Sequence, residues 1–334
     1  FSSNHNFSKG FFYVADGTFN FYDTEKKTAY QDCYASLNAG KTLGIGNYDS
    51  ANIIHSNGKF YLLVGTSTSN RDHFYIVDAK TLYYENSAVV GANLSGLTIL
   101  NEQYGLVTGD GIRRIDLKSL NNVRIKNERL LCFYNSIIYN GKVLSNDTYK
   151  DESKVKYYDV NELIAAKEGE APAVTELDII QKQKINFVLA KDGNVYTLES
   201  ADNGCNIVKI KNDFTLEKVF ANFQPAKGPY HSSPTIGMVA SETENIIYLV
   251  STDGAIYKYI LGDSDSLKAP FIAAESGVSI TAPLQLNQQS GELYVTYTEE
   301  RKDESKIVVY SKDGKVLHTV DCGESVPSQI LFNN

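Results

Sequence analysis

A short pattern recurs along this chain: a tight turn followed by a strand-like run of apolar and aromatic residues. It recurs seven times, at spacings of about 38 to 52 residues, which is the period of β-propeller blades. The copies are GFFYVADG at 10–17, NGKFYLLVGTS at 57–67, EQYGLVTGDG at 102–111, NGKVLSNDT at 140–148, DGNVYTLES at 192–200, ENIIYLVST at 244–252 and SGELYVTYTE at 290–299. A repeat of this kind favours an array of similar small sheets over one continuous core.

Each copy is followed by a second strand-like run and often by a third, and an apolar run precedes most copies. The chain has 23 Tyr, 15 Phe and no Trp, and Tyr and Phe favour strands. We therefore predict an all-β fold, a seven-bladed β-propeller with four-stranded blades. The alternatives are two β-sandwich domains and a propeller with six or eight blades. We expect a polar spacer at 1–9 and a single propeller domain over 10–334.

Two stretches complete the count of strands. The first repeat begins directly at GFFYVADG, without the strand that precedes the other copies, and the chain ends in SQILF at 328–332. We predict that this C-terminal strand pairs in the first blade and closes the ring, since closure removes unpaired strand edges. AYQDCYA at 29–35 would be the outer strand of the first blade. NELIAAKEG at 161–169 predicts one short helix, with Asn161 as its cap and Gly169 after its end.

The composition excludes some classes of partner. The 334 residues carry a formal net charge of −8, which argues against a nucleic acid as the main partner, and no apolar run approaches the ~20 residues of a membrane span. The chain does not begin with Met, so we expect it to follow a removed leader or an anchored spacer. Cys33, Cys132, Cys205 and Cys322 show no CxxC spacing, so we favour buried thiols and keep a disulfide as the alternative.

No motif predicts a catalytic, cofactor or metal site. Gly44 and Gly46 form a GxG, but a strand-like run follows instead of the helix that a phosphate loop needs. The five His show no metal-ligand spacing, and the acidic loops lack the order of an EF-hand. We therefore expect no enzyme activity, no cofactor and no metal. A metal-dependent hydrolase or lyase of propeller type stays as an alternative.

The C-terminal stretch from APFIAAESGVS to SVPSQILFN resembles the last blade of surface-layer-type, YncE-like seven-bladed β-propellers. The matching parts are Gly291 to Val295, Tyr310 to Lys315 and Pro327. The second repeat, NGKFYLLVGTSTSNRDHFYIVDAKTL, and the loop AGKTLG at 39–44 resemble the same family. The resemblance implies an exported protein, and in many members an outer-membrane lipoprotein. Some members bind cobalamin at the cell surface and pass it to an outer-membrane transporter.

These observations lead to one functional hypothesis. We expect a non-enzymatic, exported binding protein, a monomer at the cell surface or in the periplasm, whose loops on one propeller face capture a small molecule such as a corrinoid or a glycan. An alternative is an interaction scaffold on an outer-membrane transporter. Tyr supplies contact area at low entropic cost and Arg pairs with anionic groups. The predicted ligand-binding residues are Tyr48, Arg71, His73, Tyr149, Tyr230, His231 and Arg301.

Overall fold

The computed structural model describes residues 5–43, 50–65, 71–92, 94, 96–109, 111–127, 136–146, 152–170, 172–182, 185–226 and 237–333. The chain forms two compact units. Unit 1 comprises Phe1–Tyr149, Lys156–Thr175 and Gln329–Asn334, and unit 2 comprises Lys150–Val155 and Glu176–Ser328. The prediction of one domain over 10–334 stays a prediction.

Seven sheets, called blades 1 to 7 in chain order, hold the strands of the described residues. They confirm the predicted all-β, seven-bladed propeller with four-stranded antiparallel blades as the fold class. Blade 1 contains β28 (Pro327–Leu331), β1 (Gly10–Ala15), β2 (Thr18–Asp23) and β3 (Thr28–Tyr30). Blade 2 contains β4 (Ser50–Ser56), β5 (Lys59–Gly65), β6 (Asp72–Asp78) and β7 (Tyr84–Gly91). Blade 3 contains β8 (Gly96–Ile99), β9 (Tyr104–Gly109), β10 (Gly111–Asp116) and β11 (Asn122–Lys126).

The remaining blades follow the same order along the chain. Blade 4 contains β12 (Ile137–Tyr139), β13 (Lys142–Asn146), β14 (Ser153–Asp159) and β15 (Val174–Gln181). Blade 5 contains β16 (Val188–Leu189), β17 (Val195–Ala201), β18 (Gly204–Ile210) and β19 (Leu216–Phe223). Blade 6 contains β20 (Met238–Ala240), β21 (Ile246–Val250) and β22 (Ile256–Ile260). Blade 7 contains β23 (Val278–Ile280), β24 (Gln285–Leu286), β25 (Leu293–Glu299), β26 (Glu304–Tyr310) and β27 (Val316–Gly323).

Two blades depart from the four-strand pattern. In blade 7 the first strand is divided into β23 and β24, which both pair with β25. Pro283 lies between them, and because it has no N–H to donate it interrupts the strand. In blade 6 the described residues form three strands. Where a fourth strand would pair with β22, Ile272 forms an isolated bridge with Ile256, and the 3-10 helix η2 (Ser264–Leu267) follows β22.

The apolar repeat runs lie in strands that are buried on both faces. In β5, Phe60, Leu62 and Val64 belong to the core shared with blade 1, which also contains Phe12 and Leu331. The alternate side chains Tyr61 and Leu63 belong to the core shared with blade 3. Because successive side chains of a strand point to opposite faces, a continuous apolar run can fill two cores at once. This explains why the repeat reads as FYLLV and IIYLV instead of a strict alternation.

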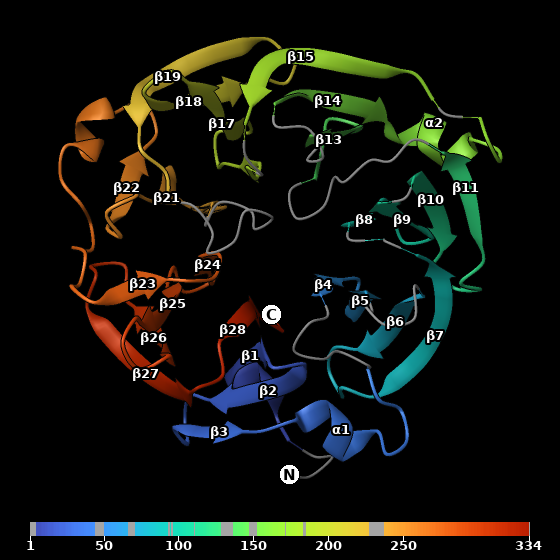
Figure 1. The fold of residues 1–334 in the computed structure, drawn as a ribbon, viewed down its shortest axis with the longest axis horizontal. Helices are drawn as coiled ribbons and strands as arrows, with labels where there is room; N and C mark the ends of the chain where they lie inside the picture. Colours follow the sequence, from blue (N-terminus) through green and yellow to red (C-terminus); the bar gives the residue numbers. More distant parts are fainter. Residues whose placement is uncertain are drawn as a thin grey trace. The chain divides into compact units, whose positions relative to one another are not determined.

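The two ends of the chain meet in blade 1, as predicted. β28 pairs with β1, and Figure 1 shows the C-terminus beside these two strands. Leu331 packs in the core of blades 1 and 2, and the Gln329 side chain donates a hydrogen bond from Nε2 to the Ile53 carbonyl of β4 at 2.7 Å. The last strand therefore holds the first blade and also contacts the second.

Two helical segments differ in detail from the sequence prediction. The expected outer strand at 29–35 is β3 followed by helix α1 (Cys33–Leu37), because Asp32 takes a left-handed conformation (φ 46°), which breaks the strand, and accepts a hydrogen bond from Ala35 N–H. The helix predicted at 161–169 is α2 (Val160–Ala165), and its cap is Asp159, not Asn161. The Asp159 carboxylate at the end of β14 accepts from the N–H of Glu162, an arrangement found in capping boxes.

The cysteines and the N-terminal segment also have described positions. Cys33 and Cys205 are buried and Cys322 is half-buried. Cys33 and Cys322 are free thiols, and burial raises the pKa of each to about 12. Cys132 lies outside the described residues.

Within the predicted spacer at 1–9, residues 7–9 form the 3-10 helix η1 (Phe7–Lys9), and Phe7 is buried in the core of blade 1. No helix in the described ranges is long and apolar enough to cross a membrane.

Removal of residues 326–334 is expected to destabilise unit 1. Ile330 and Leu331 are 3% and 7% exposed, and the burial of two such side chains contributes about 3–6 kcal/mol. The deletion also exposes the paired edge of β1. Thermal unfolding of the truncated chain should show a melting temperature many degrees lower. Removal of 333–334 alone is the control and should change little. A full truncation that melts with the intact chain would contradict the closure.

The stability should also fall in mildly acidic solution. His5 Nε2 lies 3.6 Å from the Asp23 carboxylate, and the imidazole packs against Phe7, Phe21 and Tyr30. Burial lowers the pKa of His5 below its ordinary 6.5, and Lys26 lowers it further, while Asp23 acts in the opposite direction. A group with a lowered folded-state pKa binds its proton more tightly in the unfolded chain. The contribution of neutral His5 to the free energy of unfolding is therefore complete above pH 6.5, and it decreases as the pH falls below that value.

This pH dependence can be measured in thermal melts between pH 8 and 5.5. The melting temperature should decline below pH 6.5, and the decline should be smaller in a His5→Gln variant. It should not vanish, because burial also lowers the pKa of His55. Equal slopes for the variant and the wild type would show that His5 is not responsible.

Candidate functional site

The structure describes three of the seven ligand-binding residues predicted from sequence. Tyr48, Tyr149, Tyr230 and His231 lie outside the described residues. In unit 1, Arg71 is exposed just before β6, and His73 lies on β6 with its ring stacked on Tyr75 at 6.0 Å between centroids. In unit 2, Arg301 is exposed in the turn between β25 and β26. Their role in binding stays a prediction.

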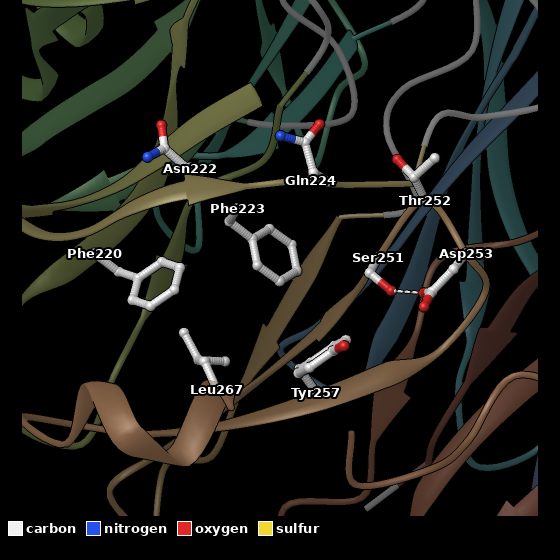
Figure 2. Close-up of a pocket in the computed structure, with 9 residues that line it drawn as sticks. All are labelled: Phe220, Asn222, Phe223, Gln224, Ser251, Thr252, Asp253, Tyr257 and Leu267. Atoms are coloured by element: carbon white, nitrogen blue, oxygen red, sulfur yellow. Dashed lines mark hydrogen bonds between the residues drawn. The ribbon is translucent and has the colours of Figure 1, made fainter. Parts of the chain in front are cut away.

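Unit 2 contains an open groove of about 470 Å³ between blades 5 and 6. This volume lies within the range of ~300–1,000 Å³ of small-molecule sites. The groove is lined by Phe220, Asn222, Phe223, Gln224, Ser251, Thr252, Asp253, Tyr257 and Leu267. Figure 2 shows the rings of Phe220 and Phe223 with Leu267 toward one end and the Ser251–Asp253 pair toward the other. We call this the β19/β22 groove.

A bulge in β19 brings two aromatic side chains into the groove. Phe223 pairs with Cys205 and Phe220 pairs with Ile207, so three steps along β19 match two steps along β18. Asn222 takes up the additional residue in a left-handed conformation, with φ 62°. In a regular strand, residues three apart point to opposite faces, but an inserted residue restores them to the same face. The bulge thus explains why both rings line the same groove.

The turn between β21 and β22 forms the polar side of the groove. The Ser251 hydroxyl and the Ala255 N–H both donate to Oδ1 of Asp253, and Gly254 takes a φ of 86° that completes the tight turn. The turn is attached to the end of β19, because Thr252 N–H donates to the Gln224 carbonyl at 2.8 Å and Thr252 Oγ1 donates to the Pro225 carbonyl at 3.0 Å. The two sides of the groove are therefore fixed to each other within unit 2.

Tyr257 on β22 completes the aromatic side. Its ring meets the ring of Phe223 edge to face, with a centroid distance of 6.0 Å and an interplanar angle of 88°. Phe220 and Tyr257 are half-buried and pack against the outer part of the core between blades 5 and 6, whereas Phe223 is only 6% exposed. Leu267, at the end of η2, is buried beside them. The described residues of blade 6 place η2 here instead of a fourth strand, which leaves the two outer rings accessible.

Asp253 sets the electrostatic character of the groove. Hydrogen bonds from the Ser251 hydroxyl and from the Ala255 N–H lower the pKa of the Asp253 carboxyl, so it is ionised at neutral pH. Both hydrogen bonds go to Oδ1, and within the described residues Oδ2 accepts none. Among the described lining residues, Asp253 is the one with a formal charge. The groove is therefore a weakly anionic site with an aromatic wall.

Sequence reasoning reached only part of this site. The sequence predicts an inter-blade loop over 222–234, but Asn222 and Phe223 are the last residues of β19, and Gln224 follows the strand. The other six lining residues were missed: Phe220, Ser251, Thr252, Asp253, Tyr257 and Leu267. A readable signal was the pair of aromatic residues, Phe223 and Tyr257, in strands that leave the regular pattern, together with the STDGA turn at 251–255. In the parts of the chain that the structure describes, no group of three or more His, Cys, Asp or Glu could hold a metal ion.

Comparison with solved structures shows the propeller fold. A functionally unknown protein from Desulfotomaculum acetoxidans DSM 771 has a TM-score of 0.60 and 13% identity, over 97% of this chain and 99% of that chain. Dihydro-heme d1 dehydrogenase NirN, in complex with DHE, has a TM-score of 0.57 and 12% identity, over 98% of this chain and 75% of that chain. Kluyveromyces lactis Hsv2 has a TM-score of 0.51 and 11% identity, over 99% and 98%. Identities this low support the fold alone.

The search of curated proteins found no match. A family profile described as "Domain of unknown function (DUF5074)" matches residues 7–333, which is almost the whole chain. The match covers all seven blades, including β28, which completes blade 1. The chain therefore belongs to the DUF5074 family of β-propeller proteins.

Proposed function

We propose that this protein is a non-enzymatic binding protein that captures a small ligand. The observation that carries the proposal is the β19/β22 groove, which combines three aromatic side chains with amide, hydroxyl and carboxylate groups in about 470 Å³. Concave sites with a largely apolar lining and a few convergent polar groups are typical of ligand binding. The groove sits on strands and a hydrogen-bonded turn, so its residues are held in place before a ligand arrives.

The polar groups of the groove favour binding over catalysis. The Ser251 hydroxyl donates to Asp253, which superficially resembles a nucleophile next to a base. A carboxyl whose pKa lies below its ordinary value is a weak general base at neutral pH. The same hydrogen bonds close the turn, so we assign Ser251 and Asp253 to the architecture and the charge of the groove.

The resemblance to YncE-like surface propellers supports the remaining parts of the proposal. In that family, exported members and outer-membrane lipoproteins are common, and some pass cobalamin to a transporter. We propose the same setting here: export to the periplasm or the cell surface, a corrinoid or a glycan as the ligand, and an outer-membrane transporter as a protein partner. The net charge of −8 agrees with a partner other than a nucleic acid.

Replacement of the two outer rings should weaken ligand binding. In a Phe220→Ala, Tyr257→Ala double variant, each lost aromatic contact costs about 0.5–1.5 kcal/mol beyond its buried area. We expect the affinity to fall at least tenfold in calorimetric titrations with cyanocobalamin and with neutral oligosaccharides. Tyr83→Ala is the matched control, because Tyr83 is an exposed aromatic residue (42%) in unit 1.

The melting temperature of each variant must be measured alongside, since Phe220 and Tyr257 also contact the core. A double variant that remains folded and binds with the wild-type affinity would remove the groove from the binding function. Absence of binding by the wild-type protein to every ligand would contradict the proposed function itself.

The loop residues predicted from sequence are tested separately. A Tyr149→Ala, Tyr230→Ala double variant should lose binding without a change in melting temperature if the loops contact the ligand, as the sequence hypothesis states. If this variant binds normally while the groove variant does not, the loop assignment is wrong and the binding function remains. The two double variants thus separate the two candidate surfaces.

A further inference from the structure

We infer that the β19/β22 groove binds a neutral saccharide. This inference rests on the proposed binding function and narrows its ligand to a chemical class. The residues that carry it lie within unit 2, on blades 5 and 6 and on η2, and all of them are described. Three properties of the groove lead to this class: its charge, its aromatic wall and its polar groups without partners.

The charge of the groove disfavours anionic ligands. Asp253 is negatively charged at neutral pH, as an aspartate ordinarily is, and hydrogen bonds lower the pKa of its carboxyl further, while none of the described lining residues is basic. A phosphate or carboxylate ligand would meet a like charge with no cation to offset it, which costs binding energy in a partly desolvated site. The ligand is therefore neutral or cationic.

The aromatic wall requires a ligand with an apolar face. Phe223 and Tyr257 meet edge to face, and Phe220 and Leu267 extend the apolar surface beside them. A pyranose ring carries C–H groups on its faces and hydroxyls around its edge. Such an amphipathic ring can cover aromatic carbon with one face and direct its hydroxyls to polar groups at the rim.

The polar groups distinguish a sugar from a compact cation. Asn222 and Asp253 are exposed and Tyr257 is half-buried, and the Asn222 amide, the Tyr257 hydroxyl and the Oδ2 atom of Asp253 make no hydrogen bonds to other described protein groups, so they are available to a ligand. A quaternary ammonium could pair with the aromatic rings and the carboxylate, but it has neither donors nor acceptors for Asn222 and Tyr257. A ligand that covers these groups without replacing their hydrogen bonds to water binds less tightly. Vicinal hydroxyls both donate and accept, so a saccharide satisfies all three groups.

The test titrates the intact protein with a panel of defined probes. The neutral probes are cellotetraose, maltotetraose and chitotetraose. Tetragalacturonate is the anionic comparator, choline is the cationic one, and cyanocobalamin represents the corrinoids. We expect at least one neutral tetrasaccharide to bind, and tetragalacturonate to bind at least tenfold more weakly than the best neutral probe.

Variants then place the binding in the groove. Asp253→Asn should lower the affinity for the neutral probe about tenfold, as expected for loss of a hydrogen bond to a charged group. The ratio of the affinities for the neutral probe and for tetragalacturonate should become smaller, because the variant removes the negative charge. Asp213→Asn is the matched control, because Asp213 also accepts from a hydroxyl and a backbone N–H in a turn of unit 2 but lies outside the groove. It should change neither affinity. Tyr257→Phe keeps the ring and should cost only a few-fold.

Several outcomes would overturn the inference. Tighter binding of choline than of any neutral saccharide, or binding of cyanocobalamin alone, would replace the ligand class and leave the proposed binding function standing. Saccharide binding that Asp253→Asn and Phe220→Ala leave unchanged would place the sugar at another site. If no probe binds, the inference and the proposed function fail together.

Discussion

Strand β28, from the C-terminal end of the chain, completes the four strands of blade 1. Its pairing with β1 covers an edge that would otherwise expose a row of backbone donors and acceptors, and Leu331 fills the core formed by Phe12 and Leu62. Gln329 extends the contact to the backbone of β4. The closing pair joins residues from opposite ends of the chain, so its formation carries a large loop-closure cost, which cooperative burial offsets.

A carboxylate recurs at the end of the third strand in blades 1 to 4. Asp23, Asp78 and Asp116 each end a third strand, and each accepts hydrogen bonds from two backbone N–H groups of the following turn. Asp159 occupies the same place in blade 4, and there the following residues form helix α2. One acidic residue at the end of a strand thus serves either a turn or a helix, because both begin with backbone donors that need an acceptor.

The sequence was sufficient for the repeating part of the fold, since apolar runs such as FYLLV and turn residues such as Asn57–Gly58 act locally. It was insufficient where a single backbone conformation decides the outcome. Asp32 breaks the expected outer strand by a left-handed conformation, and Asp159 takes the cap that Asn161 was expected to form. The candidate groove could not be predicted from the sequence for a different reason. Phe220 and Tyr257 come together only through a strand bulge and the pairing of Thr252 with Gln224, which composition and spacing do not report.

The groove lies beside blade 6, in which the described residues form three strands. A fourth strand along β22 would cover the outer end of the core between blades 5 and 6 and bury Phe220 and Tyr257. The described residues provide η2 and the Ile256–Ile272 bridge in its place, which satisfy part of the edge of β22 and bury Leu267. The rings that remain half-buried are costly to leave against water, yet the turn at Ser251–Ala255 holds polar groups beside them. We propose that a ligand covers this accessible apolar surface, because fixed hydrogen-bonding groups lie directly beside it.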